Sequence, residues 1–361
     1  MALSLIAGPP NSGRAGEIRR RLTEALPSEP VLVVPTTDDV TRFERELCGG
    51  AGAVIGGSVR TFEWLFSDVA DAVGSQTARP ARPLSAVQRR RAIEVAARDC
   101  ADGRMRALSA RPGFVEALAD AIEDLQAGGV EPDAVERAAR EVPGAEHLRG
   151  VAAAYRAYAD LRDGLGRSDR HVMGREAIAG LRSRPDAWGG RPVLVYGFDD
   201  LSEEQLALVE ALAGATNVTV AVTFEDDRAP LAARATLLTR LAEIAGSEPL
   251  RLPPNAEHTA SPVLYAIERG LFEDEPRRAE PDSGLVLLES AGERAEAEAI
   301  GAEVARLIGE GAERDSIAIT LRTVQRLGPL YAGVLERFGV PASVHADIPL
   351  AGTGVGAGLL A

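Results

Sequence analysis

The sequence predicts an α/β fold in which a parallel sheet is covered by helices and interrupted by a helical insertion. Two observations support this prediction. Short apolar runs alternate with helix-compatible segments near both ends of the chain, which is the order of a parallel sheet. Between them, residues 84–179 contain no strand-like run, and their apolar residues recur at spacings of three and four.

The first stretch of the chain is expected to open the sheet. Its elements, in order, are strand 3–7, helix 17–26, strand 31–34, helix 38–47 and a weak strand at 54–55. Val31–Val34 is continuously apolar, as in a strand buried on both faces. Asp38 is suited to cap the helix that follows it.

The second stretch returns to the sheet after Trp188–Pro192 breaks the helical pattern. Residues 193–198 and 218–224 are strand-like, and Ser202–Gln205 has the pattern of a helix start. The helical block is therefore an insertion into one sheet.

A polar, Pro-containing segment at 273–283 predicts a linker, and a new α/β pattern follows it. Its elements, in order, are strand 285–288, helix 293–310, strand 317–321 and helix 327–338. A sheet this small buries too little apolar surface to be stable alone. We therefore expect residues 284–361 to be an incomplete second domain.

Composition excludes several classes of protein. The chain has 361 residues, with 45% hydrophobic and 26% charged residues, the usual mix for a globular protein of two or more domains. No apolar run approaches the ~20 residues that span a bilayer, and the N-terminus lacks the basic region of a signal peptide. Two cysteines make no disulfide framework. We expect a cytoplasmic protein with no membrane partner.

Charge narrows the function further. All 40 basic residues are arginine, which excludes a Schiff-base lysine, a P-loop lysine and the usual Asp…Glu-X-Lys core of a nuclease. The formal net charge is −14, with −1 in residues 1–190 and −13 in residues 191–361. Because free nucleic-acid binders tend to carry a basic face, we expect any DNA-facing surface in the first part.

The turn after the first strand resembles a phosphate-binding loop. That loop has the pattern Gly, four residues, Gly-Lys-Ser/Thr between a strand and a helix, and its backbone N–H groups face the phosphates. Here Gly8 and Gly13 are present, but Arg14 replaces the lysine and Ala15 replaces the hydroxyl residue. On the motif alone, an ordinary Gly/Pro turn explains the pattern equally well.

The order of features along the chain resembles superfamily 1 helicases, and most closely the AddB-like component of AddAB-type helicase–nucleases. Val31–Leu47 is similar to the second strand and following helix of that family, and Gly57–Leu65 to its "TFHSL"-type segment. Val193–Gln205 falls at the position of the helicase "DEFQD…Q" segment. Ile317–Arg322 and Val334–Pro341 are similar to the start of the second motor domain.

This resemblance implies a RecA-like P-loop NTPase fold. Residues 1–83 and 191–272 would form the first motor domain, 84–190 the helical insertion, 273–283 the linker, and 284–361 the start of a second RecA-like domain. The implied partners are an AddA-like helicase–nuclease subunit and DNA, as double-strand ends or single strands. The PD-(D/E)XK nuclease part of the family is absent from this chain.

The departures from the family concern the nucleotide. Tyr196 and Gly197 stand where active motors have the metal-binding Asp and the water-activating Glu. Asp199 and Asp200 are better explained as a solvated loop or a helix cap. The residues that the resemblance assigns to a degenerate nucleotide site are Gly8, Ser12, Gly13, Arg14, Ala15 and Arg322. At most weak binding of ATP and Mg²⁺ is expected, and no catalytic or metal-ligating residue is assigned.

The resemblance also suggests where DNA would bind. The candidate contacts are Thr61, Phe62, Trp64, Arg89, Arg90 and Arg91. For the three consecutive arginines, a solvated helical face is the simpler explanation. For the two aromatic residues, a core position for at least one is expected.

Three functions are compatible with these features. The preferred one is a non-hydrolysing, helicase-like part of an ATP-dependent helicase/exonuclease subunit in DNA double-strand break repair and recombination. The first alternative is an active ATP-dependent helicase motor with an unusual arginine-containing loop. The second is an unrelated α/β protein-interaction domain.

Overall fold

The computed structural model describes residues 2–51, 53–74, 82–100, 102–111, 113–145, 148–276, 278–346, 350 and 353–360. These residues form two compact units. The first comprises Met1–Ala260 and Tyr265–Arg278, and the second comprises Ser261–Leu264 and Ala279–Ala361. The first unit contains the main sheet and the helical insertion.

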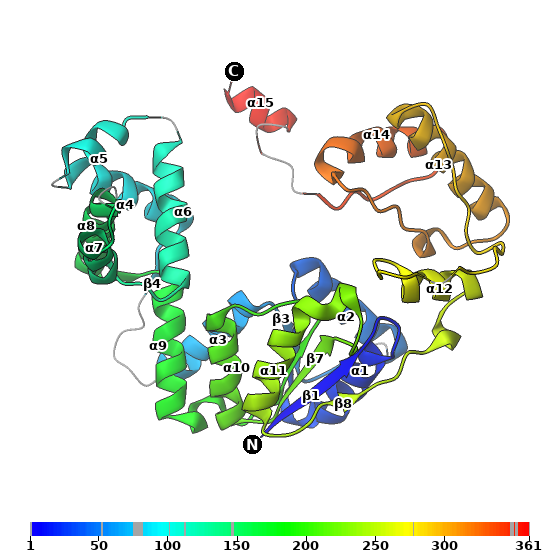
Figure 1. Ribbon diagram of the computed structural model, residues 1–361, viewed down its shortest axis with the longest axis horizontal. Helices are drawn as coiled ribbons and strands as arrows, with labels where there is room; N and C mark the ends of the chain where they lie inside the picture. Colours follow the sequence, from blue (N-terminus) through cyan, green and yellow to red (C-terminus); the bar gives the residue numbers. More distant parts are fainter. Residues whose placement is uncertain are drawn as a thin grey trace. The chain divides into compact units, whose positions relative to one another are not determined.

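A six-stranded sheet in the order β3-β2-β6-β7-β1-β8 organises the described part of the first unit (Figure 1). Its strands are β1 (Leu3–Gly8), β2 (Val31–Val33), β3 (Ser58–Arg60), β6 (Val193–Tyr196), β7 (Val218–Thr223) and β8 (Leu250–Arg251). All pairs are parallel, and β1 pairs with β7 along its whole length. The predicted mixed α/β fold with a parallel sheet is confirmed.

Both faces of this sheet are covered by helices, which explains the continuous apolar runs. One face carries α1 (Arg14–Ala25) and α2 (Thr37–Ala51); the other carries α3 (Phe62–Gly74), α9 (Arg170–Ser183), α10 (Glu203–Ala215) and α11 (Ala235–Ala245). Ile6, Leu32 and Leu194 point to the first face, and their neighbours Leu5, Val33 and Val195 point to the second. Successive side chains of a strand alternate, so every strand position is apolar.

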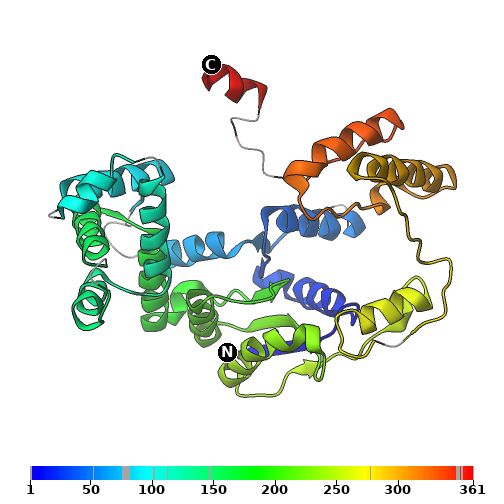
Figure 2. The same ribbon diagram turned by 45° about the horizontal axis from the view of Figure 1, so that its top comes forward.

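The helical insertion has a hydrophobic core of its own. Its helices are α4 (Ala86–Asp99), α5 (Gly103–Leu108), α6 (Phe114–Ala127), α7 (Pro132–Glu141) and α8 (Leu148–Gly164). They enclose Ile93, Ile122, Tyr155 and Tyr158, all fully buried. Figure 2 shows these helices as a separate group, joined to the rest of the unit through α3 and α9. A short parallel pair, β4 (Arg82–Pro83) with β5 (Arg167–Ser168), closes the entry and exit of the insertion.

Helix α9 packs with the sheet layer although it follows the insertion in sequence. Its Ile178 and Leu181 lie in the same core as Val69 of α3 and Trp188 of the 3-10 helix η2 (Pro185–Trp188). A Cβ atom on Gly180 would come within 2.2 Å of the Val73 side chain, so α3 and α9 are in close contact there. Apolar spacing alone does not distinguish a helix of the insertion from one that covers the sheet.

The second unit has a small helical core. Its described helices are α13 (Glu293–Gly309), the 3-10 helix η5 (Arg314–Ser316), α14 (Val324–Arg337) and α15 (Gly354–Leu360). Ala297, Tyr331 and Val334 form its buried centre. The remaining described helices are η1 (Leu26–Ser28), η3 (Ala229–Arg234), η4 (Ala256–His258) and α12 (Pro262–Gly270), which spans the boundary between the units, and the predicted helix starts near Ser202, Glu293 and Leu327 agree with the structure to within three residues.

Two strands predicted in the second unit are absent from it. Residues 285–288 and 317–321 belong to no strand of the described chain, and the Leu287 side chain is 92% exposed. Ile319 and Leu321 pack against the small core of the unit without pairing their backbone. An apolar run predicts a strand only where a neighbouring strand accepts its hydrogen bonds, and the described unit offers none.

Two local predictions in the first unit were also wrong. The third strand begins at Ser58 rather than at residue 54, because Gly56 and Gly57 both have positive φ and turn the chain before pairing starts. The second helix begins at Thr37, where the hydroxyl of Thr36 accepts the backbone N–H of Asp39 at 3.1 Å, so Thr36 rather than Asp38 caps it.

The packing of α9 on the sheet layer gives a stability test. Leu181 is fully buried between α3, α9 and the sheet, whereas Leu165 is 58% exposed. We expect Leu181→Ala to lower the free energy of unfolding by about 2–5 kcal/mol, because it removes buried surface and leaves a cavity. The matched change Leu165→Ala should cost less than about 0.5 kcal/mol. Equal urea midpoints for the two variants would contradict this placement of α9.

Candidate functional site

The candidate site is the loop 9–13 between β1 and α1, at the carboxyl edge of the parallel sheet. Gly13 has a φ of 87° and precedes the first residue of α1, a backbone that favours glycine. A Cβ atom on Gly8 would lie 2.5 Å from the Ser12 hydroxyl, so the Ser12 side chain folds back over the end of β1. The Ser12 hydroxyl is buried and has no hydrogen-bond partner.

Arg14 begins α1 beside the ends of two other strands. Its Nε atom donates to the Pro9 carbonyl oxygen at 3.4 Å. Burial lowers the pKa of the Arg14 guanidinium below its ordinary value; the nearby Tyr196 and Asp199 oppose this shift, and Arg234 adds to it. The structure therefore brings the loop together with the turn after β6 and with η3 after β7.

Arg234 is the residue of this edge that sequence reasoning missed. Its Nη2 atom donates to Asp199 at 2.6 Å, while its Nε atom is buried without an acceptor. It ends η3, eleven residues past the end of β7, and follows the charged segment 224–228, which alone attracted notice in the sequence. Only the parallel pairing of β1 with β7 shows that this arginine lies near Arg14.

The positions expected to hold a metal do not fit one. Ala15 has no oxygen in its side chain, and Tyr196 packs edge-on against Phe43 with ring centroids 5.7 Å apart. Gly197 has a φ of 90°, and a Cβ atom there would lie 3.2 Å from the Pro35 ring. Asp200 accepts the backbone N–H of Leu201 at 2.8 Å, next to the Ser202–Gln205 capping box of α10. Nowhere in the described ranges do three or more His, Cys, Asp or Glu side chains form a group that could hold a metal ion.

The remaining predicted nucleotide residue, Arg322, belongs to the second unit. It lies in the turn that precedes α14 and is half-buried there. Its contacts are those of its own unit.

The candidate DNA contacts at the end of β3 separate into core and surface residues. Phe62 is buried and packs edge-on against Phe198 with ring centroids 4.9 Å apart, so its ring belongs to the core. Trp64 is 43% exposed, and the Arg60 guanidinium lies 5.7 Å from its ring. Thr61 is half-buried, and its carbonyl oxygen accepts the first backbone bond of α3. The accessible surface here is that of Thr61 and Trp64.

The three consecutive arginines of α4 are all ion-paired. Arg90 pairs with Glu116 at 2.8 Å and Arg91 with Glu94 at 2.7 Å, both at the surface. Arg89 pairs with Glu123 at 3.0 Å and also lies 3.8 Å from a buried carboxylate, that of Asp169. Arg89 therefore faces the interior of the insertion rather than a solvent-exposed surface.

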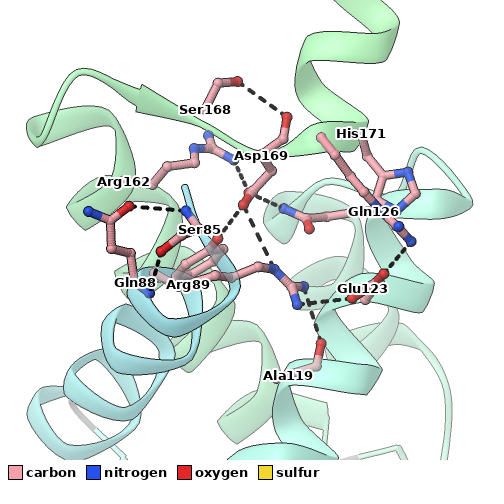
Figure 3. Close-up of polar contacts among 12 residues, drawn as sticks. Ser85, Gln88, Arg89, Ala119, Glu123, Gln126, Arg162, Ser168, Asp169 and His171 are labelled. Atoms are coloured by element: carbon pink, nitrogen blue, oxygen red, sulfur yellow. Dashed lines mark hydrogen bonds and ion pairs between the residues drawn. The ribbon is translucent and has the colours of Figure 1, made fainter. Parts of the chain in front are cut away.

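Asp169 is the centre of this buried polar network (Figure 3). Its carboxylate accepts the Gln126 amide at 2.6 Å, the Arg162 guanidinium at 3.0 Å and the Tyr158 hydroxyl. Burial, reinforced by the bond to Asp169, raises the pKa of the Tyr158 hydroxyl. Donors from α6 and α8, and the charge of Arg89 on α4, thus converge on the residue just before α9.

The network continues from α9 to the sheet layer. Arg170 donates to Nε2 of His171 at 3.3 Å, so His171 donates through Nδ1 to Glu204 of α10 at 2.7 Å. A Cβ atom on Gly174 would lie 2.2 Å from a Glu204 oxygen, which explains why glycine occupies this position. The insertion is therefore fixed to α10, the helix that follows the turn after β6.

Comparison with known proteins agrees with the family resemblance. No family model matches the chain. A curated ATP-dependent helicase/deoxyribonuclease subunit of the AddB type from Desulforudis audaxviator (strain MP104C) is 26% identical over 97% of this chain. Its counterpart of the same name from Symbiobacterium thermophilum is 24% identical over 95% of it. The chain is AddB-like, as predicted, and it spans about a third (32%) of the length of these curated relatives.

Among the helices of the described residues, none is both long and apolar enough to cross a bilayer.

The Asp169 network gives a second stability test. Asp169→Asn removes the negative charge from a site whose side chain is 2% exposed and leaves the buried Arg162 guanidinium with less compensation. We expect the free energy of unfolding to fall by about 3–5 kcal/mol. The control is Asp163→Asn, which removes an exposed carboxylate bound to the same arginine and should cost at most about 1 kcal/mol. Urea unfolding of both variants is the measurement, and similar losses would show that Asp169 is not the centre of the network.

Proposed function

We propose that this chain is a helicase-like, non-hydrolysing part of an ATP-dependent helicase/exonuclease subunit that acts in DNA double-strand break repair and recombination. The observation that supports this most strongly is the carboxyl edge of the sheet. There the loop 9–13 keeps the strand–loop–helix position of a phosphate loop, while Ala15, Tyr196 and Gly197 lack the side chains that phosphoryl transfer needs. The names of the two relatives support the helicase–nuclease context.

The sheet order and the β1–loop–α1 unit support a RecA-like first motor domain made of residues 1–83 and 191–272. We assign residues 84–190 to its helical insertion, 273–283 to a linker, and 284–361 to part of a second motor domain. The proposed partners are an AddA-like subunit and DNA, in the cytoplasm. At β3, Thr61 and Trp64 are the residues that we assign to single-stranded DNA.

The chemistry of the loop decides between a scaffold and a motor. Arg14 can donate to phosphate oxygens, and bidentate phosphate contacts are typical of arginine. Mg²⁺, which would neutralise the phosphates in an active motor, finds no hydroxyl at position 15 and no carboxylate at positions 196 and 197. The residues present therefore support phosphate binding through Arg14 and not hydrolysis.

Restoring one side of the site should not restore turnover. Arg14→Lys with Ala15→Thr supplies the phosphate lysine and a metal-side hydroxyl, but no group orients the attacking water. We expect this double variant to gain affinity for ATP and to show no DNA-stimulated phosphate release. Adding Tyr196→Asp and Gly197→Glu is the minimum for turnover, at a cost of about 1–3 kcal/mol in strain at the positive φ of Gly197.

The alternative, an active motor with an arginine loop, makes the opposite prediction for the wild-type chain. It requires DNA-stimulated turnover on the order of 1 s⁻¹ or more, abolished by Arg14→Ala. Phosphate release measured with and without DNA distinguishes the two functions. That result in the wild-type chain would replace the scaffold by the motor.

A further inference from the structure

One end of the helical insertion carries a group of exposed arginines that no other part of the site uses. Arg104 and Arg106 lie on α5, Arg111 follows α5, and Arg149 lies in the first turn of α8. All are exposed. We call these four residues the α5 arginine patch.

The packing of α5 brings these arginines onto one end of the insertion. Asp102 caps α5 by accepting the backbone N–H groups of Arg104 and Met105 at 2.8 and 3.0 Å. Arg106 reaches back to the carbonyl oxygens of Arg98 and Cys100, so α5 is held against the end of α4.

The start of α8 lies directly against the same short helix. A Cβ atom on Gly150 would come within 2.6 Å of the Met105 side chain, which is buried. Arg149 is therefore beside α5 although it lies far from it in sequence.

The charges of the patch are not neutralised by the chain. Within the described ranges, none of the four arginines forms an ion pair, unlike Arg89, Arg90 and Arg91. The nearest acids in sequence are already engaged, since Asp99 pairs with Arg98 at 2.9 Å and Asp102 is the cap of α5. In a chain with a net charge of −14, four guanidinium groups without counter-charges are a local exception.

We propose that the α5 arginine patch binds the phosphate backbone of DNA. Guanidinium groups donate to phosphate oxygens in bidentate geometry, and clustered exposed arginines are the electrostatic footprint of a polyanion site. Residues 98–111 and 148–150 contain no aromatic side chain on which a base could stack, so the patch contacts backbone and is indifferent to base sequence. The inference rests on the proposed function in taking DNA as the polyanion.

The test is the salt dependence of DNA binding by the whole chain. Binding of a fluorescein-labelled duplex with a single-stranded tail is measured by anisotropy over a series of salt concentrations. The variant Arg104→Ala/Arg111→Ala/Arg149→Ala should weaken binding at low salt. It should also reduce the slope of log K against log salt by about 2 to 3, because each lost phosphate contact contributes about 0.7 to 0.9.

The matched control is Arg20→Ala/Arg306→Ala/Arg326→Ala, which removes the same charge from exposed arginines that are ion-paired on their own helices or to a neighbouring one. It should leave the slope unchanged. Thermal melts followed by circular dichroism check that both triple variants are folded.

Three results would overturn the proposal. If the patch variant keeps the wild-type slope while the wild type binds DNA, DNA is contacted elsewhere, and the proposed function stands without this site. If the control variant loses as much slope as the patch variant, net charge explains the binding. If the wild type binds poly-glutamate through the patch but not DNA, the partner is an acidic protein surface. The assay contains no nucleotide, so its outcome is independent of the phosphate-release measurement.

Discussion

The parallel pairing of β1 with β7 and of β7 with β6 is the constraint on which the rest of the structure depends. Because these strands share one direction, the loop 9–13, the turn after β6 and the segment that leads to Arg234 all leave the sheet at the same edge. The pairing is stabilised by side chains such as Ile6, Val195 and Val220, which are almost fully buried. None of this packing involves the side chain of residue 15. The edge can therefore keep its geometry while its chemistry changes.

Arginine is the only cationic side chain apart from histidine, and its surroundings define three different roles. Arg162 is buried against Asp169 and stabilises the insertion. Arg14 is partly desolvated at the strand edge with only a carbonyl oxygen as its partner, which suits a ligand that brings negative charge. Arg104 and its neighbours are exposed and without carboxylate partners, which suits a polyanion. Sequence proximity does not separate these roles, since Arg89 faces the interior while Arg90 and Arg91 remain at the surface.

The parts of the fold that depend on local pattern could be predicted from the sequence. Val31–Val33 and Val193–Tyr196 are strands because both faces of the sheet are covered, and Ser202 begins α10 through a capping box with Gln205. The parts that depend on distant partners could not. Residues 285–288 have the composition of a strand but no described neighbour with which to pair. The proximity of Arg14 to Arg234, and of Asp169 to Gln126, joins residues far apart in sequence, and no spacing rule reveals it.

The central claim is that the chain keeps the position of a phosphate loop without the side chains that hold its metal. Equilibrium dialysis of labelled ATP, with Mg²⁺ and with a chelator in its place, tests this claim most directly. If Arg14 is the group that meets the phosphates, binding should be weak and no tighter with Mg²⁺ than without it, and Arg14→Ala should abolish it. If Mg²⁺ tightens binding by about tenfold or more, equivalent to about 1.4 kcal/mol, a metal site exists at this edge and the claim is wrong.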